Sequence, residues 1–212
     1  MSPKVSDDHK EKRRLEILQA AKRVFHQKGF ERATMSDIVA ESGLSRGGVY
    51  WYFTDKEELI HALFEHLSEQ FVLDLSQMTD RYASAWDALE AFVEENKQAV
   101  LRQADDPDTA SVAEFFVSGW RDERRRNLTI ARYRGASEQL HQLVLHGVKT
   151  GEFRPQVDLA VIVQGIFTNL DALQQSRFFL GPDVLDVEGQ FALLKTFLRF
   201  CLGLDTKGAS RP

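Results

Sequence analysis

Apolar residues recur at helical spacing along most of the chain, whereas strand-like alternation of apolar and polar residues is scarce. The first clear case lies near the N-terminus, where one helical stripe holds Ile17, Ala21, Val24 and Phe25. Gly29 follows this stripe and is typical of the residue just past a helix end. The pattern predicts an all-α protein whose first helix ends beside Gly29.

Two short helices joined by a tight turn are predicted next, over residues 34–53. Thr34 can cap the first of them, and Asp37, three residues later, fits a weaker form of the capping box. Gly43 is expected to end this helix, and Ser45 to cap the second one. Two short helices joined by a turn that contains glycine have the layout of a helix-turn-helix unit.

Longer helices are predicted for the rest of the chain. Thr54 and Glu57 have the spacing of a capping box, which would begin a helix over about residues 55–78. Further periodic segments predict helices over roughly 86–104, 109–119, 122–148, 157–179 and 187–203. The total expected is about nine helices.

The last two predicted helices are rich in apolar residues. Those residues are Leu159, Ile162, Val163, Ile166, Phe167, Leu170 and Leu173 in the first, with Phe191, Leu194, Leu198, Cys201 and Leu202 in the second. Two such helices from each of two chains can pair as a four-helix bundle with two-fold symmetry. We therefore expect a homodimer that forms through these residues.

The second short helix has a composition that folding alone does not explain. At 100° per residue, Val49 and Phe53 point to one side, and Gly47 and Trp51 point almost the opposite way. A glycine inside a helix costs about 1 kcal/mol relative to alanine. Gly47 and Gly48 together are therefore expected where something large approaches the backbone closely.

The second helix of a helix-turn-helix unit enters the DNA major groove, and this defines the candidate contacts. Arg46 can reach a guanine edge or a phosphate, and Gly47 leaves the backbone bare beside it. The side chains placed to contact phosphates, sugars or a thymine methyl are Thr34, Ser36, Ser45, Tyr50, Trp51, Tyr52 and Lys56. The alternative is that the charges are solvated and the aromatic rings pack on a neighbouring domain.

Charge is distributed unevenly along the 212 residues, whose net charge is −5. Residues 1–56 hold 11 Lys/Arg and 8 Asp/Glu, whereas the remainder holds 16 and 24. The basic run Lys10–Arg14, expected to precede the first helix, is either a contact for phosphates or the minor groove, or a solvated helix start. The run Arg121–Arg126 is expected to be a solvated helix start, with contact to an anionic ligand as the alternative.

Other kinds of chemistry find little support in the sequence. Cys201 is the only cysteine and lies in an apolar helix, so we expect an inert core residue and no disulfide within the chain. No apolar leader or run of 18 apolar residues is present, and a cytoplasmic protein without membrane spans is expected. The histidine spacing does not fit a metal site, and no nucleotide fingerprint or nucleophile elbow occurs, so neither cofactor nor enzymatic activity is expected.

The segment Thr34–Leu59, TMSDIVAESGLSRGGVYWYFTDKEEL, closely resembles the DNA-binding signature of the tetracycline-repressor (TetR) family of transcriptional regulators. The clear resemblance covers about residues 11–71. It implies an N-terminal three-helix DNA-binding domain over 11–71, with its helix-turn-helix motif at 34–53, and a helical ligand-binding and dimerisation domain over 72–205. By similarity, the DNA contacts are Thr34, Ser45, Arg46, Gly47, Tyr50, Trp51, Tyr52 and Lys56.

The resemblance also implies a function. It indicates a homodimeric repressor that a small-molecule effector releases from a palindromic operator in double-stranded DNA. Candidate residues for the effector pocket, chosen because such pockets are mostly apolar and aromatic, are Trp86, Phe116, Trp120, Phe167 and Asn169. The alternative from another class is a helical small-molecule carrier or enzyme whose N-terminal unit binds protein instead of DNA.

Overall fold

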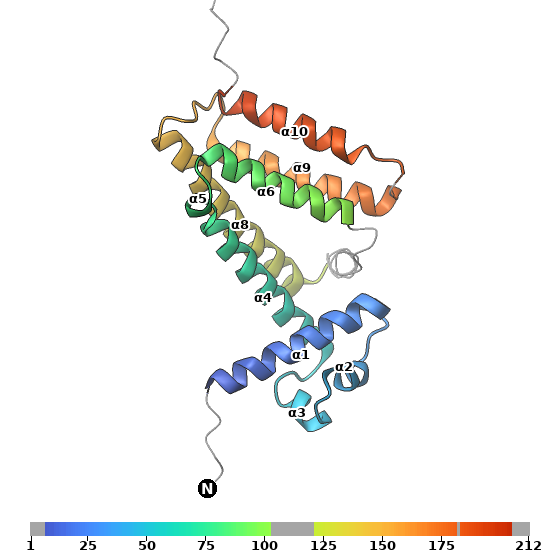
Figure 1. Cartoon of the computed structure of the whole chain (residues 1–212). Coiled ribbons are helices and arrows are strands. Elements are labelled where there is room, and N and C mark those ends of the chain that lie inside the picture. The colour runs from blue at the N-terminus through green and yellow to red at the C-terminus, as the bar shows by residue number, and fades with distance from the viewer. Residues whose placement is uncertain (1–6, 103–120, 182, 205–212) are drawn as a thin grey trace, which may run out of the picture. The chain divides into compact units, whose positions relative to one another are not determined.

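The computed structural model describes residues 7–102, 121–181 and 183–204, which divide into two units (Figure 1). These residues form nine helices and no strand, which confirms the predicted all-α class. The helices are α1 Asp7–Lys28, α2 Met35–Ser42, α3 Arg46–Tyr50, α4 Lys56–Ser76, α5 Met78–Arg81, α6 Ala85–Arg102, α8 Glu123–Lys149, α9 Leu159–Leu180 and α10 Val187–Cys201. The predicted helix over 109–119 lies outside the described residues.

The first unit contains described residues 7–68 and 121–130, and so includes α1, α2, α3 and the start of α4. α1 packs against α2, and α2 contacts α3. The core of this unit contains the predicted stripe of α1 together with Ile38, Val49, Phe53 and Leu59. Residues 121–130 belong to this unit although they follow it by some fifty positions in the chain.

The predicted ends of α2 are confirmed by its caps, whereas α3 ends at Tyr50 and so is shorter than the predicted helix, which extended to residue 53. Thr34 accepts a hydrogen bond from the Asp37 amide at 3.2 Å, and Asp37 accepts one from the Thr34 amide at 3.0 Å, which completes the capping box. Gly29 after α1 and Gly43 after α2 have positive φ values of 75° and 66°. Glycine adopts this left-handed conformation without a steric clash because it has no Cβ atom, so it is suited to end each helix.

The cap of α4 differs from the prediction by one residue. Asp55, not Thr54, accepts a hydrogen bond from the Glu58 amide, at 2.8 Å. Glu58 in turn accepts from the amide and hydroxyl of Thr54. Because Glu57 is not needed for the cap, its carboxylate is available for the distant contact described below. The helix also ends earlier than predicted, at Ser76, and α5 follows it.

A second correction concerns the basic run Lys10–Arg14. It does not precede the first helix, because α1 begins at Asp7. Arg13 pairs with Glu16 at 2.7 Å, and Arg14 pairs with Glu11 at 3.2 Å. Both pairs join residues three positions apart on an exposed helix, which is the geometry expected for a solvated helix surface.

The second unit contains described residues 69–102 and 131–204 apart from residue 182. α6, α9 and α10 pack against one another, and α5 contacts α6 (Figure 1). The prediction that these apolar residues of α9 and α10 form the dimer surface is wrong, because almost all of them are buried in this unit's own core. Another set on the same helices is exposed: Val161, Phe178, Phe179 and Leu180 on α9, with Leu193, Phe197 and Phe200 on α10.

Candidate nucleic-acid interface

α3 and the turn that follows it, residues 51–53, present two opposite sides, as the helical geometry predicts. Ser45 caps it by accepting a hydrogen bond from the Gly48 amide at 3.1 Å. Val49 and Phe53 are buried in the core of the first unit, whereas the Trp51 side chain is 67% exposed. Tyr50 is exposed beside it, and a group of exposed aromatic side chains, unlike a single one, marks this face as the first candidate for contact with a partner.

The aromatic residues of this face are arranged in contact with one another. The rings of Trp51 and Tyr52 meet edge to face, with centroids 4.6 Å apart. Tyr52 is half-buried against the core and so supports Trp51 from beneath. The guanidinium of Arg46 lies 5.3 Å from the centroid of the Tyr50 ring, which holds the arginine on the exposed side of the helix.

The two glycines differ in their surroundings. A Cβ atom added to Gly47 would meet no other atom within 4 Å, so the space beside its backbone is open. A Cβ atom on Gly48 would lie 3.2 Å from the Ser45 hydroxyl that caps the helix. Gly47 is therefore the position where a partner can approach the backbone, and Gly48 is the position that the cap requires to be small.

The polar groups at the start of α2 lie on the surface, but one of them has an internal role. Thr34 and Ser36 are both exposed. The Thr34 hydroxyl also donates to Asp37 at 2.8 Å. Asp37 in turn accepts a 2.6 Å hydrogen bond from Lys28, and these hydrogen bonds lower the pKa of its carboxyl. Ser36 therefore has the more available hydroxyl of the two.

Lys56 lies in the first turn of α4, as predicted, but its ammonium has an internal role that the sequence did not indicate. It donates to the backbone carbonyls of Phe30 and Glu31, each at 3.0 Å. It also lies 4.6 Å from the centroid of the Phe30 ring. Lys56 thus ties the start of α4 to the turn between α1 and α2, so its contact with a phosphate stays a prediction.

Arg125 is the main departure from the expectation for the run Arg121–Arg126. Its neighbours in that run are exposed, but Arg125 is buried and pairs with Glu57 at 2.6 Å. His61 is buried nearby, and desolvation together with the charges of Arg124 and Arg125 lowers its pKa. A run of arginines is ordinarily solvated, so no local signal distinguished the one that the fold buries.

Comparison with known proteins decides the class of partner. Residues 17–63 match the bacterial regulatory proteins of the tetR family, and residues 88–188 match the tetracyclin repressor-like C-terminal domain. YfiR, an uncharacterized HTH-type transcriptional regulator of Bacillus subtilis, is 36% identical over 207 residues, which are 98% of this chain and 100% of that protein. The chain belongs to the TetR family.

Two solved structures of transcriptional regulators share the fold. SmeT from Stenotrophomonas maltophilia, the repressor of the multidrug efflux pump SmeDEF, is 20% identical with a TM-score of 0.69, over 94% of this chain and 96% of SmeT. FadR from Bacillus subtilis, solved in complex with stearoyl-CoA, is 20% identical with a TM-score of 0.65, over 87% of this chain and 96% of FadR.

TetR-family proteins are DNA-binding transcriptional regulators and form a non-enzymatic family. Membership therefore sets aside the alternative of an enzyme or carrier with a protein-binding head. None of the described helices is both long and apolar enough to cross a membrane.

Three of the effector residues predicted for this TetR-family chain are among the described residues, and their surroundings differ. Phe167 lies in the core of the second unit, with its ring centroid 6.2 Å from Phe92 and 5.7 Å from Tyr133. Trp86 lies under the guanidinium of Arg199, at 5.2 Å. Asn169 is exposed and donates to a carbonyl of its own helix. Phe116 and Trp120 lie outside the described residues.

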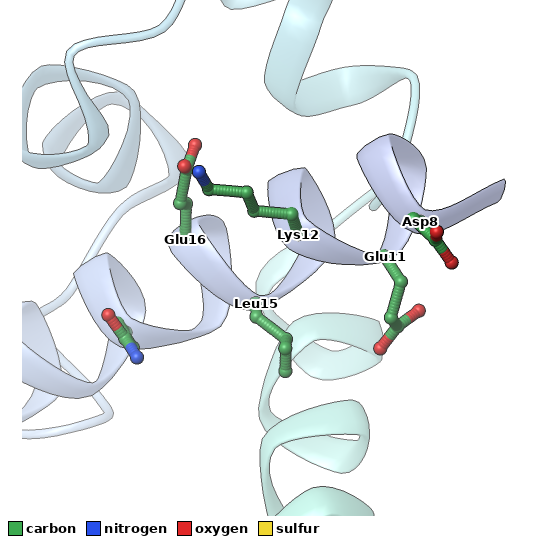
Figure 2. Close-up of a pocket in the computed structure, with 6 residues that line it drawn as sticks. Asp8, Glu11, Lys12, Leu15 and Glu16 are labelled. Carbon is green, nitrogen blue, oxygen red and sulfur yellow. The ribbon is translucent and has the colours of Figure 1, made fainter. Parts of the chain in front are cut away.

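An open hollow lies along α1 of the first unit (Figure 2). Lys12 and Glu16 point toward one another there. The hollow is lined by a single helix and is rich in carboxylates, including Asp8 and Glu11. Because carboxylates repel phosphate, this hollow does not belong to the DNA surface of a TetR-family regulator.

Proposed function

We propose that this TetR-family regulator is a homodimeric repressor, which binds a palindromic operator through α3 and leaves it when a small molecule binds the second unit. The observation that carries the DNA part is the exposed face of α3. Gly47 leaves its backbone open, and Arg46, Tyr50 and Trp51 stand around the opening. Such a face suits a helix that enters the major groove.

Each group on this face has a distinct role in the proposal. Arg46 donates to a guanine edge. Its guanidinium is already held on the Tyr50 ring, so the side chain loses less conformational entropy on binding. Tyr50, with Ser36 at the start of α2, donates to phosphates and fixes the register of the helix. Trp51 packs on deoxyribose or a thymine methyl.

The homodimer rests on exposed apolar residues of the last two helices. On α10, Leu193, Phe197 and Phe200 are 62%, 49% and 66% exposed and share one face. On α9, Val161 and Phe179 are also exposed. A second copy that covers these residues through a two-fold axis would remove them from water and present two α3 helices to one DNA duplex.

The effector part of the proposal rests on an aromatic group in the second unit that includes Phe71, Phe167 and Tyr133. The guanidinium of Arg132 lies 5.9 Å from the centroid of Phe71 and interacts with the carboxylate of Asp171. Arg132 is half-buried and Asp171 lies at the surface, and partial desolvation lowers the pKa of Arg132 and raises that of Asp171. An apolar molecule with an anionic group would match this setting, since its charge would replace water around the guanidinium. SmeT, as the repressor of a drug efflux pump, and FadR, with bound stearoyl-CoA, support a small-molecule effector by analogy.

Arg46→Ala is expected to weaken binding to the operator by roughly 1–3 kcal/mol and to relax specificity at one base pair of each half-site. The reason is the loss of a charged donor from the base edge, with the fold unchanged because Arg46 is exposed. Competition binding with a complete set of single-base operator variants measures both effects.

Lys56→Ala serves as a comparison for that experiment, because it is expected to lower DNA affinity without changing base preference. Loss of a phosphate contact should weaken all sequences alike and reduce the salt slope by about one unit. The same change removes the two hydrogen bonds to the turn at Phe30 and Glu31, so thermal stability must be measured beside it. An Arg46→Ala variant with wild-type discrimination at every base pair would contradict the role of α3.

The effector proposal predicts different responses to dodecanoate and dodecanol, which share a chain length and differ in charge. Dodecanoate should raise the melting temperature and weaken operator binding in the wild type, and should do neither in Arg132→Met. Dodecanol should have a smaller effect on both proteins, because it cannot pair with the guanidinium. Equal responses to the two compounds, or an unchanged response in Arg132→Met, would contradict an anion site at Arg132.

A further inference from the structure

An ion pair between a buried arginine and a half-exposed glutamate in the first unit joins residues that are 68 positions apart. Both carboxylate oxygens of Glu57, in the first turn of α4, accept hydrogen bonds from Nη2 of Arg125, at 2.6 and 2.9 Å. Arg125 is only 8% exposed and comes from the first turn of α8. Charged hydrogen bonds of this kind are short and directional, so they fix the two turns relative to each other.

The same arginine reaches the turn between α1 and α2. Its guanidinium carbon lies 5.1 Å from the centroid of the Phe30 ring, to which the Lys56 ammonium is 4.6 Å away. Lys56 also holds the carbonyls of Phe30 and Glu31. Three segments therefore meet around one buried ring: the turn at 30–31, the start of α4 and the start of α8.

The position of Arg125 is set locally by the start of its own helix. Asp122 accepts a hydrogen bond from the Arg125 amide at 2.9 Å, and this bond is the main cause of the lowered pKa of the Asp122 carboxyl. An anionic cap stabilises the first turn of a helix. Arg125 thus projects from a well-defined turn and does not belong to a solvated run.

α8 is one continuous helix from Glu123 to Lys149, yet it contributes to both units. Its residues up to Ile130 belong to the first unit, and those from Ala131 onward belong to the second. A helix transmits displacement along its axis because each turn is bonded to the next. A change in the second unit that shifts or rotates α8 would therefore act on the Arg125–Glu57 pair.

We infer that Arg125 is a positioning residue for operator binding: through Glu57 and Phe30 it holds the start of α4 and the α1–α2 turn in the arrangement that binds DNA, and it couples that arrangement to α8. This inference rests on the proposed function for the role of the effector.

The first test uses the duplex that the full-length wild type binds most tightly after selection from a random-sequence library. Arg125→Met should bind this duplex about tenfold more weakly at fixed salt. Arg126→Met is the matched control, because it removes the same charge from the next, exposed residue of the same helix. It should stay within about threefold of the wild type.

A double-mutant cycle distinguishes the effect of the Arg125–Glu57 contact on DNA affinity from separate effects of the two residues. Glu57→Gln should also weaken binding, and the double variant should be no weaker than Arg125→Met alone, because each change breaks the same contact. Additive losses would overturn the inference. So would wild-type affinity in Arg125→Met.

Hydrogen exchange supplies a readout that a merely structural role would not move. Because coupling is reciprocal, binding of the selected duplex should change the hydrogen-exchange rates of amides in residues 131–149 of α8 in the wild type and in Arg126→Met. In Arg125→Met, saturation with the duplex should leave these rates unchanged. No change in the wild type would overturn the coupling alone. A wild type that selects no duplex would overturn the proposed function, and this inference with it.

Discussion

Phe197→Glu is expected to give a folded monomer, whereas Leu198→Glu, one residue further along α10, is expected to unfold the protomer. Phe197 is 49% exposed, and Leu198 is 1% exposed within the core of the second unit. A carboxylate in place of Leu198 would be buried without a partner, at a cost above about 4 kcal/mol, which is a large part of the stability of a small domain. The same carboxylate in place of Phe197 remains in water in the monomer and is desolvated only when a second copy covers it.

Sedimentation at micromolar concentration and thermal unfolding followed by circular dichroism distinguish the two outcomes. Phe197→Glu should sediment as a monomer with a cooperative transition, and Leu198→Glu should lack that transition. Ala192→Glu is the matched comparison, since it adds the same charge at an exposed position of the same helix outside the face of Leu193, Phe197 and Phe200. A Phe197→Glu variant that remains a dimer would show that the two-fold contact lies elsewhere.

Gly47→Leu is expected to leave the fold intact and to weaken operator binding by about 100-fold or more, or roughly 2.7 kcal/mol. The side chain would extend into space that is empty in the free protein, because a Cβ atom there meets nothing within 4 Å. In the complex, the same space is where α3 and the groove approach each other. Replacement of a helical glycine should meanwhile raise stability by up to about 1 kcal/mol.

Stability and binding are thus expected to change in opposite directions, which distinguishes a partner surface from a structural glycine. The series Gly47→Ala, Gly47→Val and Gly47→Leu, followed by melting temperature and operator affinity, measures both. Binding should fall with side-chain size along the series. If all three variants bind the operator like the wild type, the backbone of α3 does not approach DNA at Gly47.

The features that the sequence predicted are those held by neighbouring residues. The cap at Thr34, the helix end at Gly43 and the opposed directions of Val49 and Trp51 all depend on contacts within a few positions of the chain. Such contacts follow from helix geometry and local hydrogen bonds alone. The cap of α4 was misplaced by one residue because Thr54 and Asp55 are both good caps, and only the observed hydrogen bonds choose Asp55.

The features that the sequence did not predict depend on distant parts of the chain. α10 has apolar residues on two faces, so periodicity could not say that Leu198 packs inside the protomer while Phe197 faces outward. Charge alone could not single out Arg125, because its partner Glu57 is 68 positions away. Burial of a particular charge is decided by tertiary packing, which no window of sequence contains.

The small size of α3 has a consequence for how new regulators of this kind arise or are engineered. Of its residues Arg46–Tyr50, only Val49 belongs to the core. The outward residues can be exchanged with little effect on the stability of the first unit, so base preference is free to diverge while the second unit, the proposed effector domain, stays the same. On the proposed function, a biosensor built on this chain could be assigned to a different promoter by changing Arg46, Tyr50 and Trp51, without redesign of the second unit.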